Sequence, residues 1–134
     1  MDKLRILLVD DEEDFRHLIG AKIKDWGHIC MEASRGKEAI KVLKNNDVDI
    51  VVLDYIMPEM NGLTVLRNIK KINKDIAVIM FTAYPDKRSI SGTDKLGICA
   101  YVPKFSVHSD TVGALRAAIE IARKRINKVK GGSV

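Results

Sequence analysis

The chain lacks the features that mark membrane proteins, secreted proteins and zinc proteins. It has only two cysteines, Cys30 and Cys99, and they form no zinc-binding pair. No apolar run approaches the roughly 20 residues that a membrane helix needs. Residues 1–5 lack the apolar segment and cleavage site of a signal peptide. We therefore expect a cytoplasmic protein that spans no membrane.

Aromatic residues are scarce, at 5% of the 134 residues, although hydrophobic residues as a whole reach 46%. That content is enough for a packed core and too high for a disordered chain. The length suits one domain, which we place at residues 1–127. Residues 128–134 are expected to form a flexible basic and glycine-rich tail or linker.

The formal charge of +5 is concentrated near the C-terminus. From residue 116 onward Glu120 is the only acid, against Arg116, Arg123, Lys124, Arg125, Lys128 and Lys130. Cations near the C-terminal end of a helix are favoured by its dipole and are usually solvated. Few aromatic side chains lie nearby to stack on bases, so we expect no direct nucleic acid binding by this domain.

Continuous apolar runs lie at residues 6–9, 29–33, 50–53, 76–81 and 98–102, the second being weaker. Such runs indicate strands buried on both faces, as in a parallel sheet. Helical spacing of apolar residues follows each strand, although it is sparse over 85–96, where we expect a short or mobile helix. Strand and helix thus alternate five times, which predicts a doubly wound sheet with helices on both faces.

Two helices carry clear end signals. One should end near Gly27 and bury a face formed by Phe15, Leu18, Ile19, Ile23 and Trp26. The last helix should begin at a cap formed by Ser109 or Asp110.

Chemically active side chains follow the strands. Asp10 and Asp11 come after the first strand, Asp54 after the third, Thr82 after the fourth and Lys104 after the fifth. Ligands of open parallel sheets bind beyond the carboxyl ends of the strands, so we expect these side chains to share one edge. Clustered carboxylates repel one another, and an all-oxygen cluster suits Mg²⁺ or Mn²⁺.

A metal, an ammonium and a hydroxyl together meet the needs of phosphoryl transfer, where negative charge must be positioned and neutralised. A carboxylate can act as the acceptor and form an acyl phosphate. Simpler interpretations exist for each residue alone: residues 10–14 cap a helix, Lys104 is a surface lysine and Thr82 is a turn residue. Their joint placement favours the phosphoryl-transfer site.

At these positions the sequence resembles the receiver domain of two-component response regulators, over residues 4–127. The matching segments read ILLVDDE at 6–12, VLDYIMPEMNG at 52–62, FTA at 81–83 and YVPK at 101–104. The resemblance implies a flavodoxin-like fold with strand order 2-1-3-4-5. It also implies a phosphorylation-dependent signalling switch in a two-component phosphorelay, and not a turnover enzyme.

The resemblance implies that Asp54 accepts a phosphoryl group from a phosphohistidine on a sensor histidine kinase or phosphotransfer protein. Mg²⁺ or Mn²⁺ would be bound directly by Asp11 and Asp54 and partly through water by Asp10. The backbone carbonyl of Ile56 would be a further ligand.

The resemblance also assigns the remaining site residues. Lys104 and Thr82 would contact the phosphoryl group, and Tyr101 would turn inward as a switch when Thr82 moves. Tyr101 on a central strand is alternatively a core residue. The chain departs from the family where Pro103 precedes Lys104, since most receivers have a proline after the lysine. Ile56 and Tyr84 occupy the two positions that tune loss of the phosphoryl group.

The signal would reach a partner through the face formed by residues 85–96, the strand at 98–102 and the last helix. Ala114, Ala117, Ala118 and Ile121 widen the apolar face of that helix, which suits either a homodimer or output-partner contact or a broad core contact.

A haloacid-dehalogenase-type phosphatase would need an Asp-x-Asp motif after the first strand, which is absent. A flavodoxin-type cofactor binder would need a phosphate loop there. A degenerate scaffold would lack the complete residue set.

An apolar Ile56 cannot orient a water molecule for attack on an acyl phosphate. We therefore expect Ile56→Asn to lose the phosphoryl group faster than the parent chain. Following dephosphorylation of the two proteins side by side checks this, and equal or slower loss in the variant would contradict it.

Overall fold

The computed structural model describes residues 3–55, 62–82, 97–104 and 110–132, with the side chains of Thr82 and residues 129–132 left out. Within these ranges the chain forms one five-stranded sheet whose strands are all parallel. The strands are β1 (Arg5–Val9), β2 (Ile29–Ala33), β3 (Ile50–Asp54), β4 (Ala77–Thr82) and β5 (Ala100–Pro103). Their order is β2-β1-β3-β4-β5, which confirms the predicted fold class.

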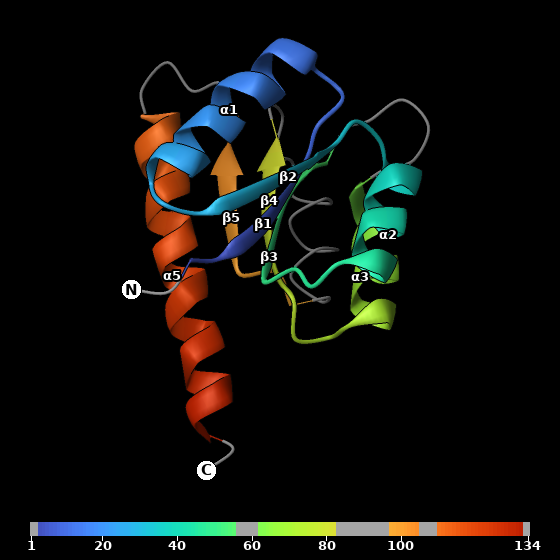
Figure 1. The fold of residues 1–134 in the computed structure, drawn as a ribbon, viewed down its shortest axis with the longest axis vertical. Helices are drawn as coiled ribbons and strands as arrows, with labels where there is room; N and C mark the ends of the chain where they lie inside the picture. The colour runs from blue at the N-terminus through green and yellow to red at the C-terminus, as the bar shows by residue number, and fades with distance from the viewer. Residues whose placement is uncertain (1–2, 56–61, 83–96, 105–109, 133–134) are drawn as a thin grey trace.

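Four helices are described: α1 (Glu13–Asp25), α2 (Gly36–Asn45), α3 (Gly62–Ile72) and α5 (Thr111–Gly132). α1 and α5 cover one face of the sheet, and α2 and α3 cover the other (Figure 1). The predicted short helix at 85–96 lies outside the described residues.

Neighbouring residues of one strand belong to different cores, because successive side chains point to opposite faces. Ile6 and Leu8 of β1 join the core under α1 and α5, whereas Leu7 and Val9 join the core under α2 and α3. All four side chains are at most 1% exposed. Burial on both faces is the reason that β1 reads as a continuous apolar run.

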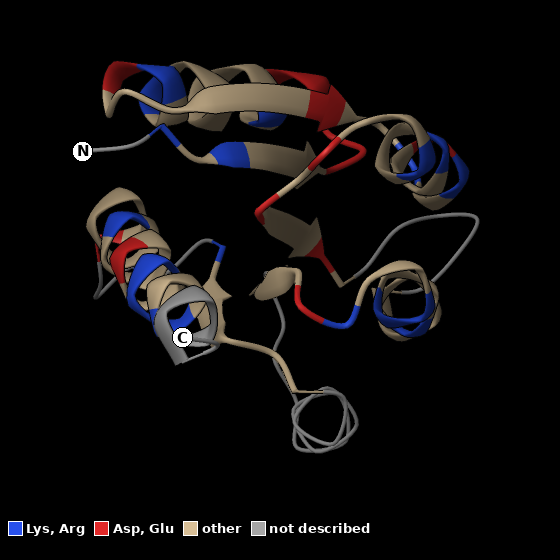
Figure 2. Cartoon of the chain, turned by 60° about the horizontal axis from the view of Figure 1, so that its bottom comes forward, with Lys and Arg blue, Asp and Glu red and all other residues tan. Residues whose placement is uncertain are grey.

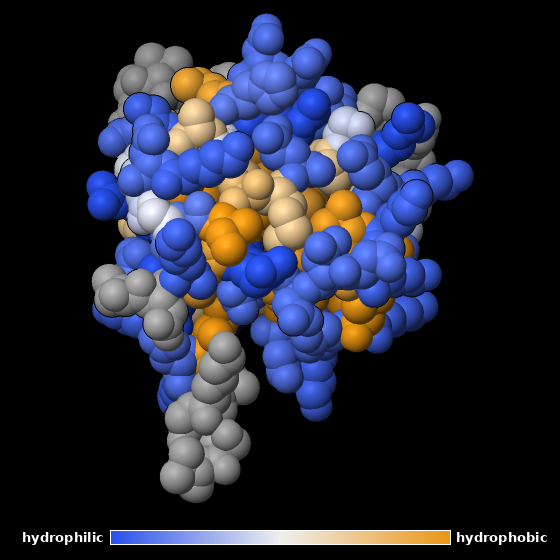
Figure 3. Space-filling model, viewed as in Figure 1, coloured by the Kyte–Doolittle hydropathy of each residue, from blue (hydrophilic) through white to orange (hydrophobic). Residues whose placement is uncertain are grey.

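One expectation about a helix face is corrected. Leu18 of α1 is 54% exposed, because the buried stripe runs through Phe15, Ile19 and Ile23 and places Leu18 beside it. On α5, Ala118 is buried but Ile121 is 52% exposed. The space-filling view shows a largely hydrophilic surface around a limited hydrophobic area (Figure 3).

The expected helix ends are present. Gly27 follows α1 with a φ of 92°, a conformation that glycine adopts without steric cost, and its N–H donates to the carbonyl of Lys24. At the start of α5, Oδ1 of Asp110 accepts a hydrogen bond from the Gly113 N–H at 3.0 Å, as expected of an N-cap.

α5 continues past the predicted boundary at residue 127 to Gly132, and its last turns extend beyond the sheet (Figure 1). Basic residues recur on successive turns of this helix (Figure 2). Part of the predicted tail is therefore helical, and the division into two units stays a prediction. None of the helices in the described ranges is long and apolar enough to cross a membrane.

His28 is a buried titratable side chain that we expect to link the stability of this fold to pH. The ring is 8% exposed and accepts a hydrogen bond from the Leu4 N–H at Nδ1. Burial, and then the charge of Arg123, lower the pKa of His28 from 6.5, although Glu120 opposes this. Below pH 6.5 the unfolded chain therefore takes up a proton before the folded chain does.

We expect the free energy of unfolding to fall as the pH drops from 6.5 to the lowered pKa of His28, by up to about 1.4 kcal/mol per unit of lowering. Urea unfolding at pH 7.5 and 5.5 measures this loss. His28→Gln should lose less stability than the parent over this range, and the exposed-site control His17→Gln should match the parent. Equal losses in all three proteins would contradict the assignment.

Candidate functional site

The carboxyl ends of β1, β3 and β5 bring together three buried charged side chains. Asp10 directly follows β1, Asp54 is the last residue of β3, and Lys104 directly follows β5. Asp10, Asp54 and Lys104 are 0%, 4% and 2% exposed. The predicted edge of the sheet therefore holds a compact ionic cluster.

Asp10, Asp11 and Asp54 form a candidate metal centre. One carboxylate oxygen from each residue lies within 4.8 Å of the others. Asp10 and Asp54 are buried whereas Asp11 is exposed, so the group combines fixed ligands with access to solvent. Oδ2 of Asp10 is buried and is contacted by the Lys104 ammonium, although among the described residues it makes no hydrogen bond. An all-oxygen, partly hydrated group of this kind fits Mg²⁺ or Mn²⁺.

The ammonium of Lys104 touches three carboxylates. Its Nζ lies 2.9 Å from Oδ2 of Asp10, 2.6 Å from Oε1 of Glu12 and 3.4 Å from Oδ2 of Asp54. Burial disfavours the charged form of Lys104, but its hydrogen bonds to Asp10 and Glu12 and the charge of Asp54 raise the pKa above its ordinary value. Lys104 therefore remains a cation at neutral pH.

Asp10 is held in place from several sides. Its backbone N–H donates to the carbonyl of Ala33, and its Oδ1 accepts a hydrogen bond from the Glu12 N–H at 2.9 Å. Arg16 donates to the Asp10 carbonyl at 2.9 Å. Burial raises the pKa of Asp10, although hydrogen bonds from Lys104 and the Glu12 N–H act in the opposite direction. The site therefore presents a fixed carboxylate whose charge depends on the neighbouring cation.

The sequence interpretation missed two neighbours of Lys104. Glu12 was assigned only to helix capping, yet it makes the shortest contact to the ammonium. The ring of Phe15 lies 4.6 Å from Nζ and stacks on Phe81 at a centroid separation of 5.3 Å. Phe15 directly follows the acidic run at residues 10–14, and that position is the only sequence signal for its contact with the site.

The structure places the remaining predicted residues as follows. Thr82 ends β4 and pairs with Pro103, although its side chain lies outside the described residues. Tyr101 is partly buried and packs against the core under α2 and α3, which agrees with its core interpretation and leaves its switch role a prediction. Ile56, Tyr84 and Phe105, which follows Lys104 where most of the family has proline, also fall outside the described residues.

The chain returns to the site where α3 begins. The Gly62 N–H donates to the carbonyl of Tyr55 at 2.7 Å. A Cβ atom at Gly62 would lie 2.6 Å from the Tyr55 Cα, which is closer than backbone atoms tolerate. Glycine at this position therefore lets α3 start directly beside the residue that follows Asp54.

Known proteins share both this sequence and this fold. A family model for the response regulator receiver domain matches residues 6–116. The response regulator UvrY of Escherichia coli is 32% identical over 116 residues, which are 85% of this chain and 53% of UvrY. A protein-glutamate methylesterase/protein-glutamine glutaminase of Trichodesmium erythraeum is 33% identical over 130 residues, which are 94% of this chain and 36% of that protein.

The chain thus spans about a third to a half of the length of the curated relatives that it matches. Among solved structures, response regulator TrrA of Thermotoga maritima, in complex with Mg(2+)-BeF, is 32% identical with a TM-score of 0.76, covering 89% of this chain and 98% of TrrA. A receiver domain protein of Clostridium thermocellum is 29% identical with a TM-score of 0.81, covering 95% and 97% of the two chains.

The close approach of Gly62 to Tyr55 predicts contrasting effects of two alanine substitutions. Gly62→Ala should lower the free energy of unfolding by about 1–3 kcal/mol, because backbone must shift to admit the Cβ. Gly20→Ala, inside α1, should raise it by about 0.4–1 kcal/mol, since the nearest atom to its Cβ is 3.5 Å away. Urea unfolding measures both, and a neutral Gly62→Ala would show that this approach is not constrained.

Proposed function

We propose that this chain, which belongs to the response regulator receiver domain family, is a signalling switch in which Asp54 accepts a phosphoryl group. The observation that carries the proposal is the convergence of three carboxylates with the Lys104 ammonium at one edge of the sheet. A related response regulator, TrrA, has been solved in complex with Mg(2+)-BeF, which supports a Mg²⁺ site in this chain as well.

The proposed reaction transfers a phosphoryl group from a phosphohistidine to Asp54. A carboxylate oxygen of Asp54 attacks phosphorus, a P–O bond forms and the P–N bond breaks. The imidazole leaves with the electron pair of that bond and takes up a proton. No redox partner is needed, and the product is an acyl phosphate on Asp54.

Each residue of the cluster has a separate role in this proposal. Asp54 supplies the nucleophile, and Lys104, already 3.4 Å from its Oδ2, neutralises charge on the incoming phosphoryl oxygens. Asp10 and Asp11, with the Ile56 carbonyl, would hold Mg²⁺ or Mn²⁺ beside Asp54. The cation supplies further neutralisation of the phosphoryl oxygens when bound.

Charge redistribution around Lys104 is the proposed start of the signal. In the structure the ammonium is shared among Asp10, Glu12 and Asp54. A phosphoryl group on Asp54 adds acceptor oxygens and negative charge next to it, which favours a different arrangement of these contacts. Thr82 and Tyr101 are the proposed route from the site to the surface of β5 and α5.

The partners follow from the family and not from this chain alone. We propose a sensor histidine kinase or phosphotransfer protein as the phosphodonor, and an output domain, partner protein or second copy on the β5–α5 side. The curated relatives are longer than this chain. Both a separate output protein and an output domain of a longer polypeptide therefore fit the proposal. A cytoplasmic location belongs to the same proposal.

Intact-mass measurement with a small acyl phosphate tests the phosphoacceptor. The parent chain should gain one phosphoryl group when Mg²⁺ is present and little when the metal is chelated. Asp54→Asn should gain none, because an amide cannot form the acyl phosphate. Asp25→Asn, an exposed acid at the end of α1, is the matched control and should behave as the parent.

Two outcomes would overturn the proposal. One is an unchanged mass in the parent chain at every metal concentration, although circular dichroism shows it folded. The other is a phosphoryl gain in Asp54→Asn that equals the parent's, which would place the acceptor elsewhere.

A further inference from the structure

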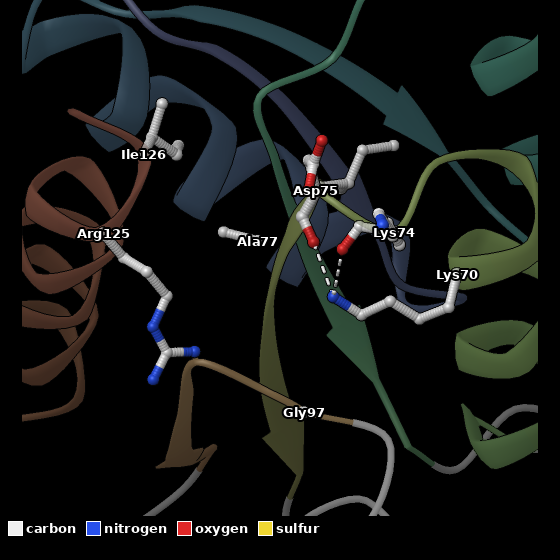
Figure 4. A pocket seen from close by; sticks show the side chains of 8 residues that line it. Lys70, Lys74, Asp75, Ala77, Gly97, Arg125 and Ile126 are labelled. Atoms are coloured by element: carbon white, nitrogen blue, oxygen red, sulfur yellow. Dashed lines mark hydrogen bonds between the residues drawn. The ribbon is translucent and has the colours of Figure 1, made fainter. Parts of the chain in front are cut away.

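A cavity lies at the opposite end of the sheet from the carboxylate cluster, where β4 begins. It has a volume of about 150 Å³ and lies between the end of α3, the start of β4 and α5. Its lining residues are Lys70, Lys74, Asp75, Ile76, Ala77, Gly97, Arg125 and Ile126. Figure 4 shows Lys70 entering from α3 on one side and Arg125 from α5 on the other.

The charges around this cavity do not balance. Lys70, Lys74 and Arg125 contribute three positive charges, and Asp75 contributes one negative charge, so the lining carries a net charge of +2. Within the described residues, none of the three cations has a carboxylate at ion-pair distance. Among the described residues, like charges are thus gathered here without a carboxylate in contact with them.

Lys70 is the most constrained of the three cations. Its ammonium donates to the carbonyl of Ile76 at 2.8 Å and to that of Lys74 at 3.3 Å, as the dashed lines in Figure 4 show. An ammonium has three N–H donors, so one remains for a ligand. Burial, and then the charge of Arg125, lower the pKa of Lys70, although Cys99 and Asp75 oppose this. A bound anion would offset both the burial of the Lys70 charge and its repulsion by Arg125.

We propose that this cavity is a binding site for a small phosphate dianion, either inorganic phosphate or the phosphate of a small monoester. The net charge of +2 suits a phosphate, which carries about 1.5 to 2 negative charges near neutral pH. A monocarboxylate would leave one positive charge uncompensated. The planar guanidinium of Arg125 can bind two phosphate oxygens at once.

The apolar part of the lining strengthens this assignment. Ile76 and Ala77 are buried at 4% and 7% exposure, and Ile126 packs against the core under α1 and α5. Low-polarity walls weaken the screening of charge by water, so each ion pair formed inside is stronger than one on an open surface. Lys74 and Arg125 are exposed, so they can close over a ligand from the solvent side.

This site is separate from the phosphoacceptor. The cluster at Asp54 lies at the carboxyl end of β3, where three carboxylates repel a free phosphate, whereas the cavity adjoins Ala77 at the opposite end of β4. Binding there requires no divalent metal and no reaction at Asp54. The inference therefore stands or falls independently of the proposed function.

Backbone amide NMR in EDTA-containing buffer tests the site. Inorganic phosphate and glycerol 3-phosphate should each shift the Ala77 and Gly97 resonances in a saturable way, whereas acetate and chloride at matched ionic strength should not. Arg125→Gln should weaken phosphate binding about tenfold or more, since a charge-assisted contact is lost. Lys124→Gln, the same charge change at an adjacent exposed residue outside the lining, should weaken it less than about twofold.

A thermal-unfolding readout separates binding from a structural role of Arg125. Phosphate should raise the Tm of the parent and of Lys124→Gln but not that of Arg125→Gln, which without anion should be at least as stable as the parent. Absence of saturable shifts in the parent would overturn the proposal, as would equal weakening in the two variants. Equal binding of malonate, a dicarboxylate, would overturn the assignment to phosphate.

Discussion

The ammonium of Lys104 balances the carboxylates that the sheet gathers at one edge. Asp10 and Asp54 are almost fully buried, and Glu12 reaches the same nitrogen from the solvent side. Removing these acids from water without a nearby cation would be costly, because burial strengthens their mutual repulsion. The protein therefore carries its own counterion at this position. Any metal or phosphoryl group that enters must rearrange contacts that already exist.

The parallel topology explains why residues so distant in sequence meet here. Lys104 and Asp10 are separated by 94 positions, yet their side chains are hydrogen bonded. Each strand of a parallel sheet ends at the same edge, so one residue placed after each strand is enough to assemble the cluster. The continuous apolar strands, buried between two layers of helices, hold those ends in fixed register. The packing of the core therefore also fixes the positions of the site residues.

The fold and the buried members of the site could be predicted because their signals are local. Apolar runs mark strands, and the residue after each run marks the edge. Glu12 and Phe15 could not be assigned in this way, because their contacts with Lys104 depend on how α1 is rotated over the sheet. The same rotation exposes Leu18, which the helical spacing alone had placed in the core. Side-chain direction on a helix is settled by packing, which periodicity only approximates.

The contact between Gly62 and Tyr55 fixes the position at which α3 begins. Tyr55 directly follows β3, and its carbonyl accepts a hydrogen bond from the N–H of Gly62, the first residue of α3. The start of α3 therefore depends on backbone atoms of Tyr55 and on the absence of a Cβ at Gly62, and not on any side chain of α3.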